Sequence, residues 1–101
     1  MAFEYAGDGA LDYFPCRYGR SKLLFRGPRR QLVPPFISAL GGSETYGKFV
    51  EEPWPALLEE RLGIPVVNFG YLNAGVDVFL GEPQLAELTR LSRLRIVQLT
   101  V

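Results

Sequence analysis

Residues 36–47 read FISALGGSETYG, an apolar run followed by a pair of glycines and then a serine. A short apolar run of this kind is typical of a strand buried in a parallel sheet, so we predict a strand over Phe36–Leu40. Many hydrolases hold a nucleophilic serine on a tight turn between such a strand and a helix. The stretch therefore favours an α/β fold and makes Ser43 a candidate catalytic residue.

Helix and strand signals alternate after this turn. Pro55 suits the first turn of a helix, and Gly63 can end that helix in a left-handed conformation. The predicted elements are a helix over Trp54–Leu62, a strand over Val66–Phe69 that ends at Gly70, a helix over Pro83–Leu91 and a strand over Arg95–Val101. Such alternation predicts a parallel sheet with right-handed crossovers.

Both predicted helices carry an apolar face. Residues three or four positions apart lie on the same side of a helix, so a stripe at this spacing is typical of a face that packs on a sheet. The stripes are Trp54, Leu57, Leu58 and Leu62 in the first helix and Leu85, Leu88 and Leu91 in the second. We expect both stripes in the core.

Residues 1–35 differ in composition from the rest, being rich in glycine, proline, tyrosine and arginine. We expect an N-terminal extension there, with a β-hairpin that pairs Ser21–Arg26 with Phe14–Tyr18. Residues 36–101 then form a βαβαβ portion of an α/β domain. The last predicted strand runs into the end of the sequence, so we expect a front portion of a longer α/β protein.

The chain has eleven basic and eleven acidic residues, so no net charge directs it to nucleic acid or to a membrane. The basic residues are nonetheless clustered, and we expect most of this cluster to be exposed arginines on a strand. Recognition of an anionic substrate or partner is the alternative. The cluster comprises Arg17, Arg20, Lys22, Arg26, Arg29 and Arg30.

The sequence also bears on cellular location and assembly. A single cysteine, Cys16, forms no internal disulfide and is expected to be a packed thiol. The sequence contains no apolar run of about 20 residues and no signal-peptide pattern at its start, so we expect a cytoplasmic protein. A parallel sheet of three strands leaves an edge open, which favours self-association.

The serine turn and its surroundings resemble the SGNH/GDSL hydrolase family. Gly41–Gly47 is similar to that family's first block, which reads Gly-Asp-Ser-x-Thr-x-Gly. Trp54–Gly63 looks like the helix that follows the block, and Val66–Gly70 looks like the second block, a strand that ends in Asn-x-Gly. The chain, including Ala10–Gly19, also resembles an uncharacterised bacterial family defined by a domain of unknown function.

The SGNH/GDSL resemblance implies a three-layer α/β/α fold, flavodoxin-like in its parallel sheet, and hydrolysis of an acyl ester or acyl carbohydrate without a cofactor. By the same resemblance, Ser43 matches the nucleophile. The backbone N–H groups of Ser43 and Gly70 match two donors of the oxyanion hole. Gly42 stands where the family has aspartate, and Asn73 stands where a second glycine is common.

The chain contains no histidine, so the usual general base for a serine nucleophile is absent. Glu44 and Asp77 are acidic residues that could assist, but the motif gives neither of them a triad role. We therefore expect the chain to be inactive on its own. A non-catalytic binding or structural domain on the same scaffold is the alternative, and a hydroxyl that caps a helix is then the role of Ser43.

Two further patterns suggest binding sites. Gly42–Lys48 matches the Gly-x-x-x-x-Gly-Lys pattern of a phosphate-binding loop, which makes nucleotide binding a third hypothesis, although Phe49 occupies the position of the magnesium-binding hydroxyl. Asn73 and Asp77 follow the second strand and could line a polar pocket. We expect no metal site, because one cysteine, no histidine and dispersed acidic residues do not make a ligand set.

Overall fold

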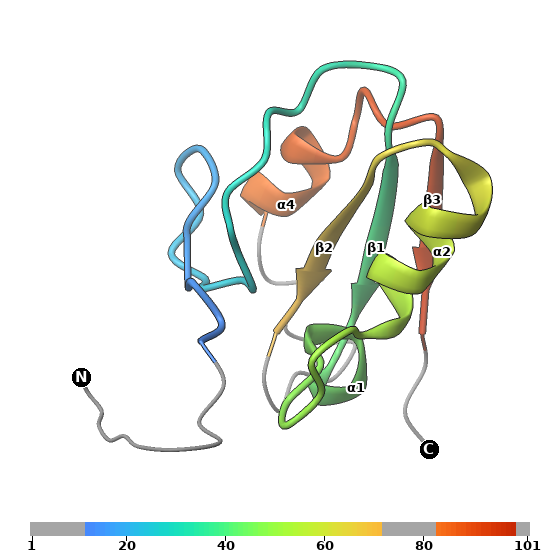
Figure 1. The fold of residues 1–101 in the computed structure, drawn as a ribbon. Helices are drawn as coiled ribbons and strands as arrows, with labels where there is room; N and C mark the ends of the chain where they lie inside the picture. Colours follow the sequence, from blue (N-terminus) through green and yellow to red (C-terminus); the bar gives the residue numbers. More distant parts are fainter. Residues whose placement is uncertain (1–11, 72–82, 99–101) are drawn as a thin grey trace.

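A computed structural model of the chain describes residues 12–71 and 83–98, and these residues form a small α/β structure built on a parallel sheet (Figure 1). The strands are β1 (Ile37–Gly41), β2 (Val66–Gly70) and β3 (Leu94–Val97). Their order is β2-β1-β3 and both pairings are parallel. The predicted parallel sheet is thereby confirmed, with the first strand one residue later than expected.

The helices in the described residues are α1 (Ser43–Tyr46), α2 (Trp54–Leu62) and α4 (Pro83–Leu88). The bounds of α2 are those predicted, with proline in its first turn and Gly63 as a left-handed C-cap. None of these helices is long and apolar enough to cross a membrane.

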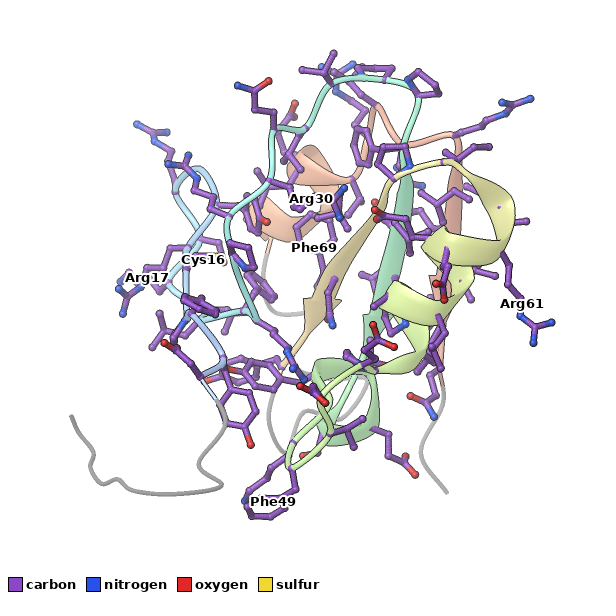
Figure 2. All side chains as sticks on the ribbon, in the orientation of Figure 1. Cys16, Arg17, Arg30, Phe49, Arg61 and Phe69 are labelled. Atoms are coloured by element: carbon purple, nitrogen blue, oxygen red, sulfur yellow. The ribbon has the colours of Figure 1, made fainter. Side chains whose placement is uncertain are left out.

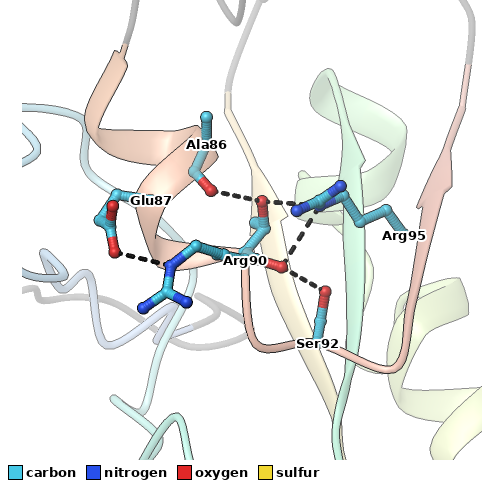
Figure 3. A network of polar contacts seen from close by, with 6 residues as sticks. Ala86, Glu87, Arg90, Ser92 and Arg95 are labelled. Carbon is cyan, nitrogen blue, oxygen red and sulfur yellow. Dashed lines mark hydrogen bonds and ion pairs between the residues drawn. The ribbon is translucent and has the colours of Figure 1, made fainter.

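The second predicted helix ends three residues early, at Leu88 rather than Leu91. A helix through Leu91 would require the Ser92 N–H to bond to the Leu88 carbonyl, but that N–H donates to the Thr89 carbonyl at 3.1 Å. The Thr89 carbonyl also accepts from the Ser92 hydroxyl and from Arg95, as Figure 3 shows for the surrounding network. The chain therefore turns after α4, and the Arg93 N–H then donates to the carbonyl of Phe36 at 2.7 Å, before the start of β1.

One face of the sheet is covered by α4 and by residues 12–35, which are called the N-terminal segment below. Residue 16 pairs with Phe25 in a single antiparallel bridge, where the sequence predicted a hairpin. Tyr18 and Phe25 are buried against Phe69 of β2, with the ring centroids of Phe25 and Phe69 5.4 Å apart at 89°. Edge-to-face contacts of this kind add to the energy of burial. Leu88 of α4 packs against the same cluster.

The opposite face of the sheet is covered by α2. Its cluster consists of Ile37, Ala39 and Val66, against which Trp54 and Leu58 are packed. Adjacent strand residues point to opposite faces, so the sequence of β1 supplies both clusters in alternation. Ser38, between two members of this cluster, faces the other side and is fully buried.

The expectation that the leucine stripes lie entirely in the core is wrong for three positions. Leu57, Leu62 and Leu91 are 44%, 50% and 51% exposed. The cluster beneath α2 is small, so only part of the apolar face of that helix reaches it. Leu91 lies beyond the end of α4 and no longer follows its helical spacing.

Helix α1 lies directly on the carboxyl end of β2. A Cβ placed on Gly70 would overlap the backbone nitrogen of Tyr46 and would lie 2.8 Å from the Thr45 carbonyl carbon. Backbone atoms cannot be moved aside by a rotamer change, so this close approach requires glycine. The sequence signal for this contact was the glycine that ends the predicted strand.

We predict that Gly70→Ala lowers the free energy of unfolding by about 2 kcal/mol or more, because an added methyl group meets backbone atoms. Gly63→Ala is the matched control. Nothing lies within 4 Å of the Cβ position of Gly63, and its φ is 71°, so it should lose only about 1 kcal/mol through backbone strain. Urea unfolding followed by circular dichroism measures both, and equal losses would contradict the packing of α1 on β2.

Candidate active site

Ser43 is the first residue of α1 and follows the glycine pair at the end of β1. The side chain is half-buried and makes interactions of its own. The Ser43 carbonyl accepts hydrogen bonds from the N–H groups of Gly47 and Lys48, at 2.8 and 3.2 Å. Gly47 has a φ of 85° and ends the helix in a left-handed conformation. A single helical turn therefore holds the serine at the carboxyl edge of the sheet.

The structure brings Ser43 and Gly70 to the same edge. Gly41 and Gly70 are register partners in the parallel pairing of β1 with β2. The pairing continues past the strand ends, because the Tyr71 N–H donates to the Gly41 carbonyl at 3.0 Å. Ligands of open α/β sheets bind at the carboxyl ends of the strands, so this edge is the natural place for a site.

The N–H of Gly70, one of the two expected oxyanion donors, already has a partner. It donates to the Asn68 side-chain oxygen at 2.8 Å, and the Asn68 side-chain nitrogen donates to the Thr45 carbonyl at 2.8 Å. Asn68 thus links the end of β2 to α1. A ligand oxygen would have to displace the Asn68 oxygen before it could accept from Gly70.

A second polar group lies where β1 and β3 end. The Thr45 hydroxyl donates to the Gln98 side-chain oxygen at 2.6 Å, and the Trp54 indole N–H donates to both, at 3.0 Å to Thr45 and 3.2 Å to Gln98. The chain leaves β1 towards β2 on one side and returns to β3 on the other, so this is a topological switch point of the sheet.

Sequence reasoning did not identify the group formed by Thr45, Trp54 and Gln98. The sequence pointed to Thr45, because this residue lies in the stretch that resembles the first SGNH/GDSL block. Trp54 is predicted to lie in the core. No sequence pattern linked Gln98 to the site, because it is 53 residues from Thr45 in the sequence. Only the pairing of β3 with β1 brings its side chain to this point.

Of the other predicted site residues, Asn73 and Asp77 lie outside the described residues. Glu44 is exposed on α1. Within residues 12–71 and 83–98, no group of three or more potential metal ligands is present. The described polar contacts of the site therefore come from hydroxyl, amide, indole and backbone groups.

Most residues of Gly42–Lys48, the stretch that matches a phosphate-binding loop, are helical. Such a loop needs open backbone between its first glycine and its lysine, whereas Ser43–Tyr46 forms α1 and Gly47 ends it. Lys48 lies over the ring of Phe49 at 5.2 Å. Phe49 is 80% exposed and points away from the molecule in Figure 2. This geometry disfavours nucleotide binding here.

Two members of the basic cluster hold the fold together. The Arg26 guanidinium donates to the carbonyls of Tyr46, Gly47, Val50 and Glu51, at 2.7 to 3.2 Å, and so fastens the N-terminal segment to the loop after α1. Arg30 forms a two-bond ion pair with Glu59 of α2. By contrast, Arg17 points to solvent (Figure 2).

A cleft of about 670 Å³ lies between the N-terminal segment and α2. Arg26 and Arg30 line this cleft, together with Glu59 and Asn68. Its apolar lining includes Phe14. Ser43 does not line this cleft, so the cleft does not coincide with the candidate nucleophile. Asn68 lines this cleft and also forms the hydrogen bonds that link Gly70 to Thr45.

Four ionisable groups among the described residues, Cys16, Tyr18, Tyr46 and Glu59, have pKa values shifted by their surroundings, and burial raises the pKa of Tyr46. Burial raises the pKa of Tyr18 to about 12, against the opposing effect of the Arg30 N–H that donates to its oxygen. Burial also raises the pKa of the Cys16 thiol, which agrees with a packed, unreactive cysteine. For Glu59, burial raises the pKa, but hydrogen bonds from Arg30 and from the Val66 N–H outweigh it and leave the pKa lowered.

The lowered pKa of Glu59 predicts a pH-dependent stability. Its stabilising contribution is fully present above the unfolded-state pKa and is lost as the pH falls through the lower folded-state value. Glu59→Gln should therefore reduce the free energy of unfolding near neutral pH, and the difference from wild type should shrink towards acidic pH. Urea titrations across this range measure the effect.

Glu60→Gln, at an exposed position of the same helix, is the control for removing one charge. It should change stability little at any pH. A Glu59→Gln difference that stays constant with pH would contradict the assigned ion pair.

Comparison with known proteins identifies a family but no function. No curated protein and no solved structure matches the chain, so the SGNH/GDSL resemblance gains no support from these comparisons. The model of the family described as "Domain of unknown function (DUF6473)" matches residues 1–101. This confirms the expected relation to a family defined by a domain of unknown function. The chain belongs to the DUF6473 family.

Proposed function

We propose that the chain carries the nucleophile of an SGNH-like acyl-ester hydrolase, with Ser43 as that nucleophile. The observation that carries the proposal is the register of β1 and β2. It sets Gly41, two residues before Ser43, opposite Gly70. The expected oxyanion donor thus lies at the end of β2, and the turn that carries the Ser43 hydroxyl follows the end of the neighbouring parallel strand β1.

The proposal includes a three-layer α/β/α arrangement of the SGNH-like kind. Two observations support it. Leu58 of α2 and Leu88 of α4 pack against different clusters on the two faces of the sheet. The order β2-β1-β3 is also the beginning of the flavodoxin-like order 2-1-3-4-5.

In the proposed reaction, the Ser43 oxygen bonds to the acyl carbon of an ester, the bond from that carbon to the alcohol oxygen breaks, and the alcohol leaves with a proton from the base. Water then attacks the acyl carbon, which releases the acid and restores the Ser43 hydroxyl. The N–H groups of Ser43 and Gly70 stabilise the oxyanion that forms, once the carbonyl oxygen replaces Asn68 as the acceptor of Gly70. The hydroxyl proton must pass to a base. Because the sequence has no histidine, that base is not an imidazole of this chain.

An external base can therefore test the nucleophile directly. We predict that p-nitrophenyl acetate acetylates Ser43 slowly, and that added imidazole accelerates this acetylation by about 100-fold or more, the usual contribution of a general base. Peptide mapping by mass spectrometry measures acetylation at Ser43 separately from lysine and the amino terminus. Ser92→Ala, which removes a half-buried hydroxyl of another loop, is the matched control and should change nothing.

Two outcomes would overturn the assignment. One is that Ser43 stays unmodified at every imidazole concentration while the lysines of the same sample are acetylated. The other is release of p-nitrophenol that Ser43→Ala leaves unchanged after subtraction of the imidazole background.

A second candidate is a non-catalytic binding domain on the same scaffold. The hydrogen bond from the Gly70 N–H to Asn68 favours it, because it closes the oxyanion site with a side chain of the protein itself. Asn68→Ala separates the two functions. Under the hydrolase proposal it frees the Gly70 N–H and speeds acetylation of Ser43, whereas a binding domain leaves Ser43 unmodified in both forms.

A further inference from the structure

The cleft of about 670 Å³ is built from three parts of the chain. The N-terminal segment and α2 line its two sides, and β2 contributes Val66 and Asn68. Its volume lies within the range of about 300 to 1,000 Å³ that is usual for small-molecule sites. Because Ser43 does not line the cleft, binding of a ligand here does not require catalysis by that residue.

Hydrogen-bond donors in the cleft are only partly used. The Arg30 guanidinium donates to both carboxylate oxygens of Glu59, at 2.7 and 3.2 Å, and its other N–H groups have no acceptor among the described residues. Its side chain is 36% exposed. The Asn68 side chain donates to the Thr45 carbonyl, and the described residues offer no acceptor for its second N–H. Both side chains can therefore donate to a ligand in the cleft.

Hydrogen-bond acceptors lie in the same cleft. The Glu51 side chain is exposed, and it has no hydrogen bond or ion pair with the described residues. Asp12 accepts from the Phe14 N–H at 2.9 Å through one oxygen, which leaves the other oxygen for a ligand. Carboxylates only accept, whereas guanidinium and amide N–H groups only donate. A ligand that bonds to all of them must carry both donors and acceptors.

An aromatic ring adjoins these polar groups. Phe14 lines the cleft and is 54% exposed. Its backbone is held by the hydrogen bond to Asp12 and by Gly27, where an added Cβ would overlap the Phe14 carbonyl oxygen. Pro28 and Pro55 add apolar surface to the lining. The backbone that carries the ring is thus fixed before a ligand arrives, which lowers the entropic cost of binding.

The mixed character of the lining selects the chemistry of the ligand. Its charges nearly balance, so the cleft favours neither an anion nor a cation. A hydroxyl group donates and also accepts, so a polyhydroxylated ligand bonds to carboxylates and to N–H groups at once. A sugar ring adds C–H surface that packs on an aromatic face. The charged side chains of the lining are Asp12, Glu51, Glu59, Arg26 and Arg30.

We propose that this cleft binds a neutral saccharide, with a sugar ring packed on Phe14 and hydroxyl groups bonded to Glu51 and Arg30. The proposal goes beyond acyl transfer, and it holds whether or not Ser43 is a nucleophile. Hydroxyl groups give up bonds to water when they bind, and the cleft is partly exposed. We therefore expect weak binding, with a dissociation constant on the order of 1 mM.

NMR titration of the 101-residue chain tests the proposal. The probes are maltose, cellobiose and N,N′-diacetylchitobiose, each taken to about 20 mM, with inorganic phosphate and tetramethylammonium as an anion and a cation at the same concentration. At least one disaccharide should give saturable shifts at the Gly27 amide and the Asn68 side-chain amide, and the two ions should not. Sodium chloride at about 0.5 M should leave the dissociation constant of the disaccharide unchanged, because that probe is uncharged.

Phe14→Ala should weaken binding of that disaccharide by about tenfold, since it removes the aromatic face. Phe49→Ala is the matched control and should bind as wild type does. Phe49 is also exposed, at 80%, and its φ of 65° is positive like the 48° of Phe14, but it does not line the cleft. Amide spectra without ligand report whether each variant is folded.

Glu51→Ala provides a second variant, at an exposed position. It should weaken binding by about threefold or more, because one hydrogen-bond acceptor is lost. Glu52→Ala removes the neighbouring exposed carboxylate, which does not line this cleft, and should change nothing.

Ser43→Ala should bind the disaccharide as wild type does, whatever its effect on acylation, so the failure of this proposal and that of the hydrolase proposal are separate outcomes. The saccharide assignment is overturned if none of the disaccharides shifts the cleft residues saturably, or if phosphate or tetramethylammonium binds there more tightly than every disaccharide. It is also overturned if Phe49→Ala weakens binding as much as Phe14→Ala.

Discussion

The structure depends on the central position of β1. All five residues of this strand are buried, and it is paired in parallel with a strand on each side. Its carboxyl end is then covered at once by α1, which approaches so closely that neither Gly41 nor Gly70 has room for a Cβ. The conformation of the serine turn is therefore tied to the sheet, and Ser43 cannot shift far unless α1 leaves the ends of both strands.

The N-terminal segment is part of the same structural unit. Tyr18 and Phe25 complete the aromatic cluster on Phe69, so the sheet would lose most of one covered face without them. Arg26 adds a polar connection, because its guanidinium binds carbonyl groups of the loop that follows α1. Cations near the carbonyl end of a helix are favourable. Part of the basic cluster is thus explained by folding, without reference to an anionic ligand.

The polar groups at the carboxyl edge bond mainly to one another. Asn68 accepts from Gly70 and donates to the Thr45 carbonyl, while the Thr45 hydroxyl bonds to Gln98 and Trp54. Such a network is rigid, and each member would cost free energy if its partner were removed. The edge has the arrangement of a ligand site, but a ligand oxygen would have to compete with Asn68. Activation of Ser43 would need both this exchange and a base.

Local sequence signals specify the class of the fold and most of its elements. Pro55 and Gly63 mark the bounds of α2, and the glycines after two apolar runs mark the ends of β1 and β2. These are local signals, because helix caps, turns and buried runs depend on residues close together in the chain. Ser43 could be placed on its turn for the same reason.

Three features depend on contacts made in the folded structure: which strand lies in the middle, where the chain runs after α4 and which side chains complete the site. After α4 the chain bonds to Phe36 through the Arg93 N–H, and Gln98 joins Thr45 because β3 pairs with β1. Leu57 and Leu62 are likewise exposed because the apolar cluster under α2 is small. Each of these features requires contact between residues distant in the chain, and no local pattern of residue types encodes such a contact.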